Sequence, residues 1–199
     1  MNQGKTLALA ALLAAPGLAC TAGFNSLEQS ADCADGTIRT RALNNLAQEV
    51  GGAELSYHGA NELNDYDGAT YSGVQRLMVR KKGSKVKGLL RVCTAGDGSA
   101  RAMPGVRLPN IMGDFGFTDI SSDENGANVT IFTGKALGDK NTVEFLHSQN
   151  WAYRGKPGAY SEIQFNRNLG KHCEGLIRAA TPNYTFHKTG YTVGFRVVK

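Results

Sequence analysis

The sequence predicts an α+β domain, mainly antiparallel β-sheet with one N-terminal amphipathic helix. Apolar residues recur at every fourth position from Ile38 to Val50, which is typical of a helix that packs one face on a sheet. Beyond Gly52 apolar and polar residues alternate and turn residues recur at short intervals, as in antiparallel strands. The chain has 199 residues, 41% hydrophobic and 20% charged, which is typical of a single globular domain.

The N-terminus has the pattern of a secretory signal peptide. A lysine precedes a short apolar run over residues 7–15, and small residues follow. We therefore predict a signal peptide over residues 1–19, with cleavage after residue 22 as the alternative, and a single β-rich exported domain over residues 20–199. The apolar run is too short to cross a bilayer and no later run is longer, so no transmembrane span is expected.

Four cysteines suit an oxidising compartment. They allow three pairings, among which we favour a local disulfide from Cys20 to Cys33 and a long-range disulfide from Cys93 to Cys173. Cleavage after Ala22 would instead leave three cysteines. Leu18-Ala19-Cys20 is also similar to a bacterial lipoprotein box, although the family pattern has Leu where this chain has Gly17, so a lipid anchor at Cys20 is a further alternative.

The helix is expected over residues 37–50, because Gly51 and Gly52 can end it in a left-handed conformation. Two long loops, residues 59–72 and 96–125, are expected to be sites of function or mobility. The expected strands are 54–58, 73–81, 85–94, 127–133, 161–166, 176–180, 183–187 and 191–198.

The most regular stretch is the β-hairpin over residues 73–94. Leu77 and Val79 alternate with Arg76, Met78 and Arg80, and Leu90 lies between Leu89 and Arg91, so we expect this apolar face to pack on the core. The tip is basic and, with a net charge of +5 for the chain, is a candidate site for anionic polymers. The tip residues are Arg80, Lys81, Lys82, Lys85 and Lys87, of which the first four are the candidate ligand-binding residues.

Aromatic and basic residues are interleaved over residues 151–167. Flat rings beside hydrogen-bond donors can bind sugar rings or anchor peptides, although buried packing is the commoner role of large aromatics. The candidate ligand-binding residues of this segment are Trp151, Tyr153, Arg154, Lys156 and Tyr160.

Catalytic and metal-binding motifs are missing from the sequence. The histidines at 58, 147, 172 and 187 do not have the spacing of metal ligands on one element. Nucleophile-elbow, phosphate-loop and dinucleotide-binding patterns are also absent. We therefore expect no metal and no cofactor, and we favour a protein that is not an enzyme.

The C-terminal segment 190–199 (GYTVGFRVVK), together with Asn150-Trp151 and Arg178, resembles the closing strand of the formylglycine-generating and related sulfatase-modifying proteins. The resemblance implies a C-type-lectin-like fold as the alternative fold. The Gly-Gly-Ser-Trp run and the reactive cysteine pair of that family are missing here, so no catalytic residue carries over.

These observations predict an exported, non-enzymatic binding or surface-interaction protein, secreted, periplasmic or at the cell surface, with a glycan, an anionic polymer or a protein as its ligand. The alternatives are a small secreted hydrolase with an acid pair from distant loops, and a structural subunit of an extracellular assembly. The sequence does not indicate an oligomeric state.

Overall fold

A computed structural model describes residues 25–34, 36, 38–65, 70–95, 98–110, 112–152, 157–182 and 189–198. These residues form twelve β-strands and no helix, so none of them lies in a helix that could cross a membrane. The strands are β1 (Asn25–Asp32), β2 (Ile38–Val50), β3 (Ala53–Asp65), β4 (Thr70–Lys81), β5 (Lys87–Thr94), β6 (Ala100–Pro109), β7 (Phe115–Asp123), β8 (Gly126–Leu137), β9 (Asn141–Ala152), β10 (Gly158–Gly170), β11 (Cys173–Pro182) and β12 (Gly190–Val198).

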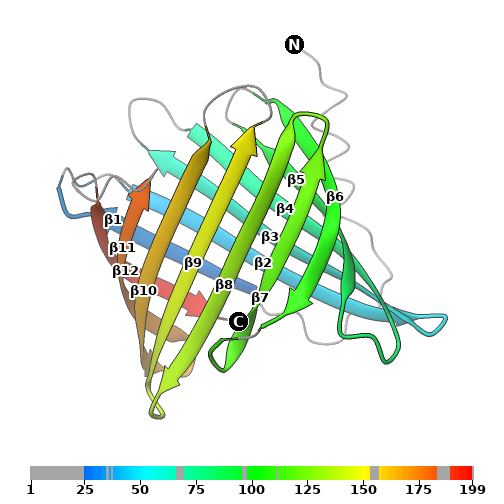
Figure 1. Ribbon diagram of the computed structural model, residues 1–199. Coiled ribbons are helices and arrows are strands. Elements are labelled where there is room, and N and C mark those ends of the chain that lie inside the picture. Colours follow the sequence, from blue (N-terminus) through cyan, green and yellow to red (C-terminus); the bar gives the residue numbers. More distant parts are fainter. Residues whose placement is uncertain are drawn as a thin grey trace.

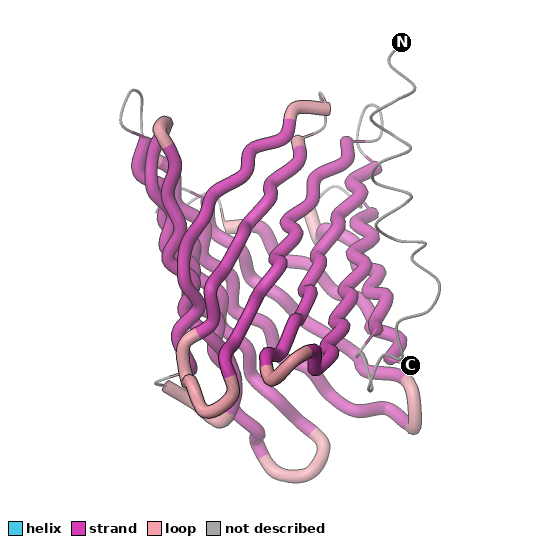
Figure 2. Tube along the Cα trace, turned by 90° about the vertical axis from the view of Figure 1, so that its right-hand side faces the viewer, coloured by secondary structure: helices cyan, strands magenta, loops and turns pink. Residues whose placement is uncertain are grey.

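The strands close into one antiparallel barrel (Figure 1). Each strand pairs with the next in sequence, and β1 pairs with β12, where Leu27 lies opposite Val197. Closure removes every free sheet edge, so each strand has hydrogen-bonding neighbours on both sides. Figure 2 shows the barrel from the side, with strands along its whole height.

One end of the barrel, the turn end, carries the start of β1, the end of β12 and the connections β2–β3, β4–β5, β6–β7, β8–β9 and β10–β11. The β2–β3 connection is a two-residue turn at Gly51 and Gly52, whose φ angles are 57° and 81°. Positive φ at both positions is the requirement of a tight hairpin turn, which glycine meets without strain.

The predicted helix is wrong, and with it the α+β fold class, because residues 38–50 form strand β2. A spacing of four is also a multiple of the strand period of two, so Ile38, Ala42, Leu46 and Val50 share one face of a strand as well as one face of a helix. On β2 that face points outward: Ile38, Leu46 and Val50 are each more than 40% exposed.

The two predicted long loops are also wrong. Strands β3 and β4 occupy most of residues 59–72, and β6 and β7 occupy much of residues 96–125. Pro104 and Gly105 disguise β6 in the sequence, because both residues are depleted in strands. Strands β1 and β9 were not predicted, and the expected strand 183–187 lies outside the described residues.

The predicted hairpin is present as β4 and β5, but its two faces are reversed. Leu77 and Val79, expected in the core, are 38% and 49% exposed. Arg76 and Arg91, expected in solvent, are 6% and 7% exposed and lie opposite each other across the pair. The alternation was therefore predicted correctly and the assignment of inside and outside was not.

Candidate functional site

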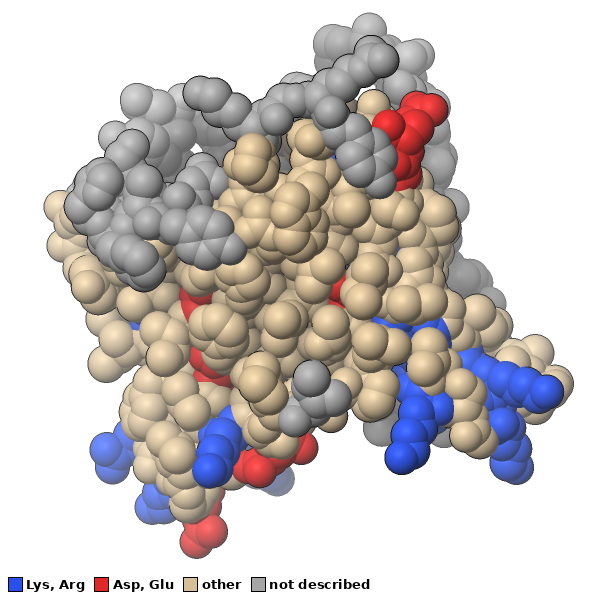
Figure 3. All heavy atoms as spheres, in the orientation of Figure 1, with Lys and Arg blue, Asp and Glu red and all other residues tan. Residues whose placement is uncertain are grey.

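The barrel is polar inside and apolar outside. On β11, Ile177 is 59% exposed and its neighbour Arg178 is 1% exposed. Figure 3 shows that the middle of one outer face is largely uncharged, with Lys and Arg gathered at its lower edge. Buried polar side chains include Glu28, Arg76, Arg91, Asp119, Glu162, Gln164, Asn166, Arg178 and Arg196, and exposed apolar ones include Leu27, Leu77, Val79, Ile120, Phe145, Ile163, Val193 and Phe195. This distribution is the reverse of that in a water-soluble domain.

A network of glutamates and arginines, the glutamate network, fills one part of the interior. Arg178 on β11 forms ion pairs with Glu28 on β1 and with Glu162 on β10, the latter at 3.1 Å. Arg41 on β2 contacts Glu162 at 3.2 Å and Glu62 on β3 at 3.0 Å. The members are Glu28, Arg41, Glu62, Glu144, Glu162, Glu174, Arg178 and Arg196.

Arg196 on β12 forms ion pairs with three glutamates of this network. Its guanidinium lies 3.3 Å from Glu28, 3.2 Å from Glu144 on β9 and 3.4 Å from Glu174 on β11. The network contains five glutamates and three arginines, and Arg39, on the same inner face of β2 as Arg41, interacts with Glu162 as well.

Several of these contacts cross the interior instead of following the wall. Arg41 and Glu162 lie on β2 and β10, which are separated by β1, β12 and β11 in the strand order. Arg196 reaches Glu144 over β11 and β10. Side chains from distant strands therefore meet, and they narrow the lumen where the network lies.

A second group, the arginine cluster, lies on β4 to β7 and consists of Arg76, Arg91, Arg107 and Asp119. Asp119 is fully buried and accepts from both Arg76 Nε at 2.8 Å and Arg107 Nε at 2.6 Å. One carboxylate thus serves two guanidinium groups.

Arg91 is the least satisfied member of the arginine cluster. Its Nη1 donates to Thr130 Oγ1 on β8 at 3.4 Å, and its buried Nε has no hydrogen-bond partner. Among the described residues, no carboxylate lies within ion-pair distance of Arg91. A buried cation without a counter-charge is costly, so this site would be stabilised by an anion from outside the protein.

Aromatic rings line the arginine cluster. The Arg107 guanidinium carbon lies 3.6 Å from the centroid of the Phe117 ring, and that of Arg76 lies 5.5 Å from it. Phe132 and His58 pack against the same ring, at 5.5 Å and 5.8 Å between centroids. These contacts hold the guanidinium groups in place without neutralising their charge.

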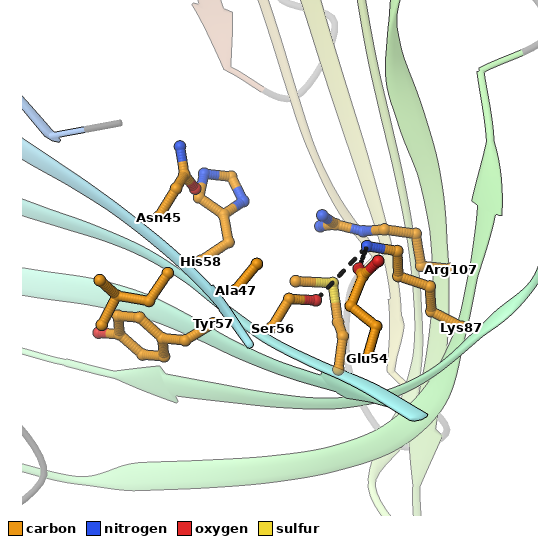
Figure 4. A pocket seen from close by; sticks show the side chains of 10 residues that line it. Asn45, Ala47, Glu54, Ser56, Tyr57, His58, Lys87 and Arg107 are labelled. Atoms are coloured by element: carbon orange, nitrogen blue, oxygen red, sulfur yellow. Dashed lines mark hydrogen bonds and ion pairs between the residues drawn. The ribbon is translucent and has the colours of Figure 1, made fainter. Parts of the chain in front are cut away.

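A cavity of about 200 Å³ lies next to the cluster, between β2, β3, β4 and the facing β5 and β6 (Figure 4). Among the residues that line the cavity, Lys87 Nζ donates to Glu54 Oε1 at 2.6 Å. Arg107 and His58 also line the cavity. In the part of the chain that the structure describes, no three His, Cys, Asp or Glu side chains come together to hold a metal ion.

The predicted aromatic residues do not form one site. Trp151 on β9 is 45% exposed on the outer face, whereas Tyr160 on β10 points inward and donates to Glu162 Oε2 at 2.5 Å. The other three predicted residues of the segment, Tyr153, Arg154 and Lys156, lie outside the described residues.

The residues of the predicted basic tip do not share one face of the barrel wall. Arg80 turns inward and forms an ion pair with Glu54. Lys81, Lys82 and Lys85 are exposed at the turn end.

The interior residues were missed because the alternating charged residues were expected on a solvent-facing side of the sheet. Charged residues two positions apart, such as Arg39 and Arg41, occur in the sequence. The same spacing describes the wet face of a soluble sheet and the lumen face of a barrel. Glu28 and Arg178 come together only through barrel closure, so no local pattern could have paired them.

The predicted disulfide from Cys93 to Cys173 is wrong. Both residues are free thiols, as is Cys33. Cys93 shares the inner face of β5 with Arg91, whereas Cys173 shares the outer face of β11 with Ile177, and the two strands are not neighbours. Cys20 lies outside the described residues.

No protein-family model and no curated protein matches the chain. The fold resembles that of a porin. The barrel is similar to a solved structure titled "KdgM porin in complex with disordered oligogalacturonate", with a TM-score of 0.56 and 8% identity over 87% of this chain and 98% of that chain. A second match, to a mutant of the Rh. blastica porin, has a TM-score of 0.35 and 9% identity over 89% of this chain and 98% of that one.

This similarity, together with the distribution of side chains, corrects the fold and the functions predicted from the sequence. The C-type-lectin-like fold is wrong, because the segment 190–199 that suggested it supplies the closing strand of a barrel. The exported binding or surface-interaction protein, and its alternatives of a secreted hydrolase and an assembly subunit, do not fit a porin-like barrel with a charged interior and an apolar exterior.

Proposed function

We propose that the protein is a porin-like channel of the outer membrane, with a narrow, charge-lined lumen for small hydrophilic solutes. The observation that carries this proposal is the reversed side-chain distribution: apolar residues cover the outside of a closed barrel and charged residues line the inside. In a bilayer all backbone polar groups must be paired within the protein, and a closed barrel achieves this.

The shape of the barrel supports the same location. An even number of antiparallel strands, an outward apolar band and a polar interior are the properties of bacterial outer-membrane barrels. The start of β1 and the end of β12 share the turn end, whose connections have two to five residues, whereas the opposite end includes the β11–β12 connection of seven residues. Short turns face the periplasm in such barrels, so we assign the turn end to that side. The signal-peptide pattern of residues 1–19 is consistent with export.

The lumen is narrow in this proposal. Glu28, Gln164 and Arg178 are each about 1% exposed, and ion pairs cross the interior between β2 and β10. A wide water-filled channel would leave such side chains exposed. We therefore expect small single-channel conductance and exclusion of large solutes.

The arginine cluster favours anionic solutes. Arg76, Arg91 and Arg107 face one carboxylate, Asp119, so the cluster keeps an excess of positive charge in a buried setting where electrostatic forces are strong. The structure of the similarly folded KdgM porin is described as a complex with oligogalacturonate. Galacturonate is a sugar carboxylate, and sugar carboxylates are the solute class we propose here.

The test is ion selectivity in a planar lipid bilayer. The full chain should insert and give discrete current steps, with a reversal potential in a KCl gradient that indicates preference for chloride. Arg91→Gln removes an unpaired charge without leaving a carboxylate unpartnered, so it should lower the chloride-to-potassium permeability ratio several-fold.

Lys135→Gln is the matched control, because it removes the same charge from the outer face of β8. It should leave the permeability ratio close to that of the wild type. Wild-type protein that inserts and gives no current would exclude a channel. Equal selectivity in wild type and Arg91→Gln would exclude the arginine cluster as the selective site.

A further inference from the structure

Exposed basic side chains gather at the turn end of the barrel. Figure 3 shows them along the lower edge of the molecule, below the uncharged middle. They form two groups, one at the β4–β5 turn and the other where β8, β9, β10 and β11 turn. We name them together the basic rim: Lys81, Lys82, Lys85, Lys135, Lys140, Arg167 and Lys171.

Three members of the rim continue the apolar outer face. Lys81 follows Val79 by two residues on β4, and Arg167 follows Phe165 by two residues on β10. Lys135 lies two residues before Leu137 on the outer face of β8. Because residues two apart share a face, these charges border the exposed apolar band.

The rim charges have no ion-pair partner in the part of the chain that the structure describes. Acidic residues near this end, Glu49, Asp114 and Asp139, are fewer than the rim residues. The nearby basic residues of the lumen differ, since Arg80 and Lys87 both pair with Glu54.

We infer that the basic rim binds the headgroups of anionic phospholipids in the leaflet at the turn end, an inference that rests on the proposed membrane location. Long basic side chains can lay their stems along apolar surface and extend their charges to the headgroup level. Clusters of Lys and Arg at a membrane surface attract anionic lipids. A phospholipid fits better than a soluble polyanion, because its acyl chains would lie against the apolar band beside the rim.

The full chain is reconstituted into vesicles of phosphatidylcholine with a minor share of phosphatidylglycerol and is then extracted with detergent. Native mass spectrometry identifies the lipids that remain bound to the extracted protein. Wild type should retain phosphatidylglycerol several-fold above its share of the vesicle. Lys135→Gln with Arg167→Gln, and separately Lys81→Gln with Lys82→Gln and Lys85→Gln, should each reduce this enrichment.

The control is Arg39→Gln with Arg101→Gln, which removes two positive charges from the inner face near the opposite end of the barrel, away from the lipid. It should keep the wild-type enrichment. No enrichment in wild type, or the same enrichment in the rim variants, would overturn the lipid site. Capture of soluble heparin by the rim without any lipid preference would overturn it as well.

Membrane insertion is measured in the same samples by protease protection and by heat-dependent migration on gels. Insertion without phosphatidylglycerol enrichment would remove the lipid site and leave the channel proposal intact. Failure to insert into these vesicles would remove both.

Discussion

Arg178→Met should destabilise the barrel by about 3 kcal/mol, at the lower end of the 3–5 kcal/mol typical of a broken buried ion pair. Arg178 is 1% exposed and holds Glu28 and Glu162. Each acid keeps a second arginine, since Glu28 also contacts Arg196 and Glu162 also contacts Arg41. The carboxylates left behind are therefore still partly compensated.

A double-mutant cycle separates the ion pair from general disruption. Arg178→Met, Glu28→Gln and the double variant would be unfolded by urea in lipid vesicles, with Lys135→Met as the exposed control. We expect the double variant to be less destabilised than the sum of the single variants, by about 1–3 kcal/mol. The control should differ from wild type by no more than about 0.5 kcal/mol. Additive single effects would refute the account of a coupled interior network.

Three further results follow from the orientation of the side chains. Ile177→Lys on the outer face of β11 should lower the free energy of unfolding by about 2–4 kcal/mol in the same urea titration. A change near zero would mean that this face contacts water and not lipid. Gly194→Ala should lower the folding yield, because a Cβ there would overlap the main-chain oxygen of Gln29 on β1; normal yield would contradict the close strand approach. A water-soluble thiol reagent should modify Cys93 and lower the channel current, and a current unchanged after complete labelling would place Cys93 off the solute path.

Local patterns in the sequence predicted much of the strand content. The hairpin formed by β4 and β5 was expected because Leu77 and Val79 alternate with Arg76, Met78 and Arg80. The helix was a misassignment of β2, because a spacing of four fits both periods. Arg39 and Arg41, two residues apart beside that apolar line, favour the strand.

The inside and outside of the sheet could not be deduced from alternation. Leu77 faces outward and Arg76 inward because the surroundings of the barrel are apolar in this account, and a period of two carries no information on which side is wet. The candidate site was missed for a second reason. Glu28 and Arg196 are 168 residues apart and meet only because β1 pairs with β12.

Quenching of tryptophan fluorescence tests the central claim, the lipid-facing exterior, most directly. Trp151 is the single tryptophan of the chain, so its signal needs no assignment, and it is 45% exposed on the outer face of β9 near one end of the barrel. Tryptophans at such positions form the aromatic girdle of membrane barrels at the headgroup level. In reconstituted vesicles we predict strong quenching by lipids brominated near the headgroup and weak quenching by aqueous acrylamide. Strong quenching by acrylamide with none by brominated lipid would contradict the account.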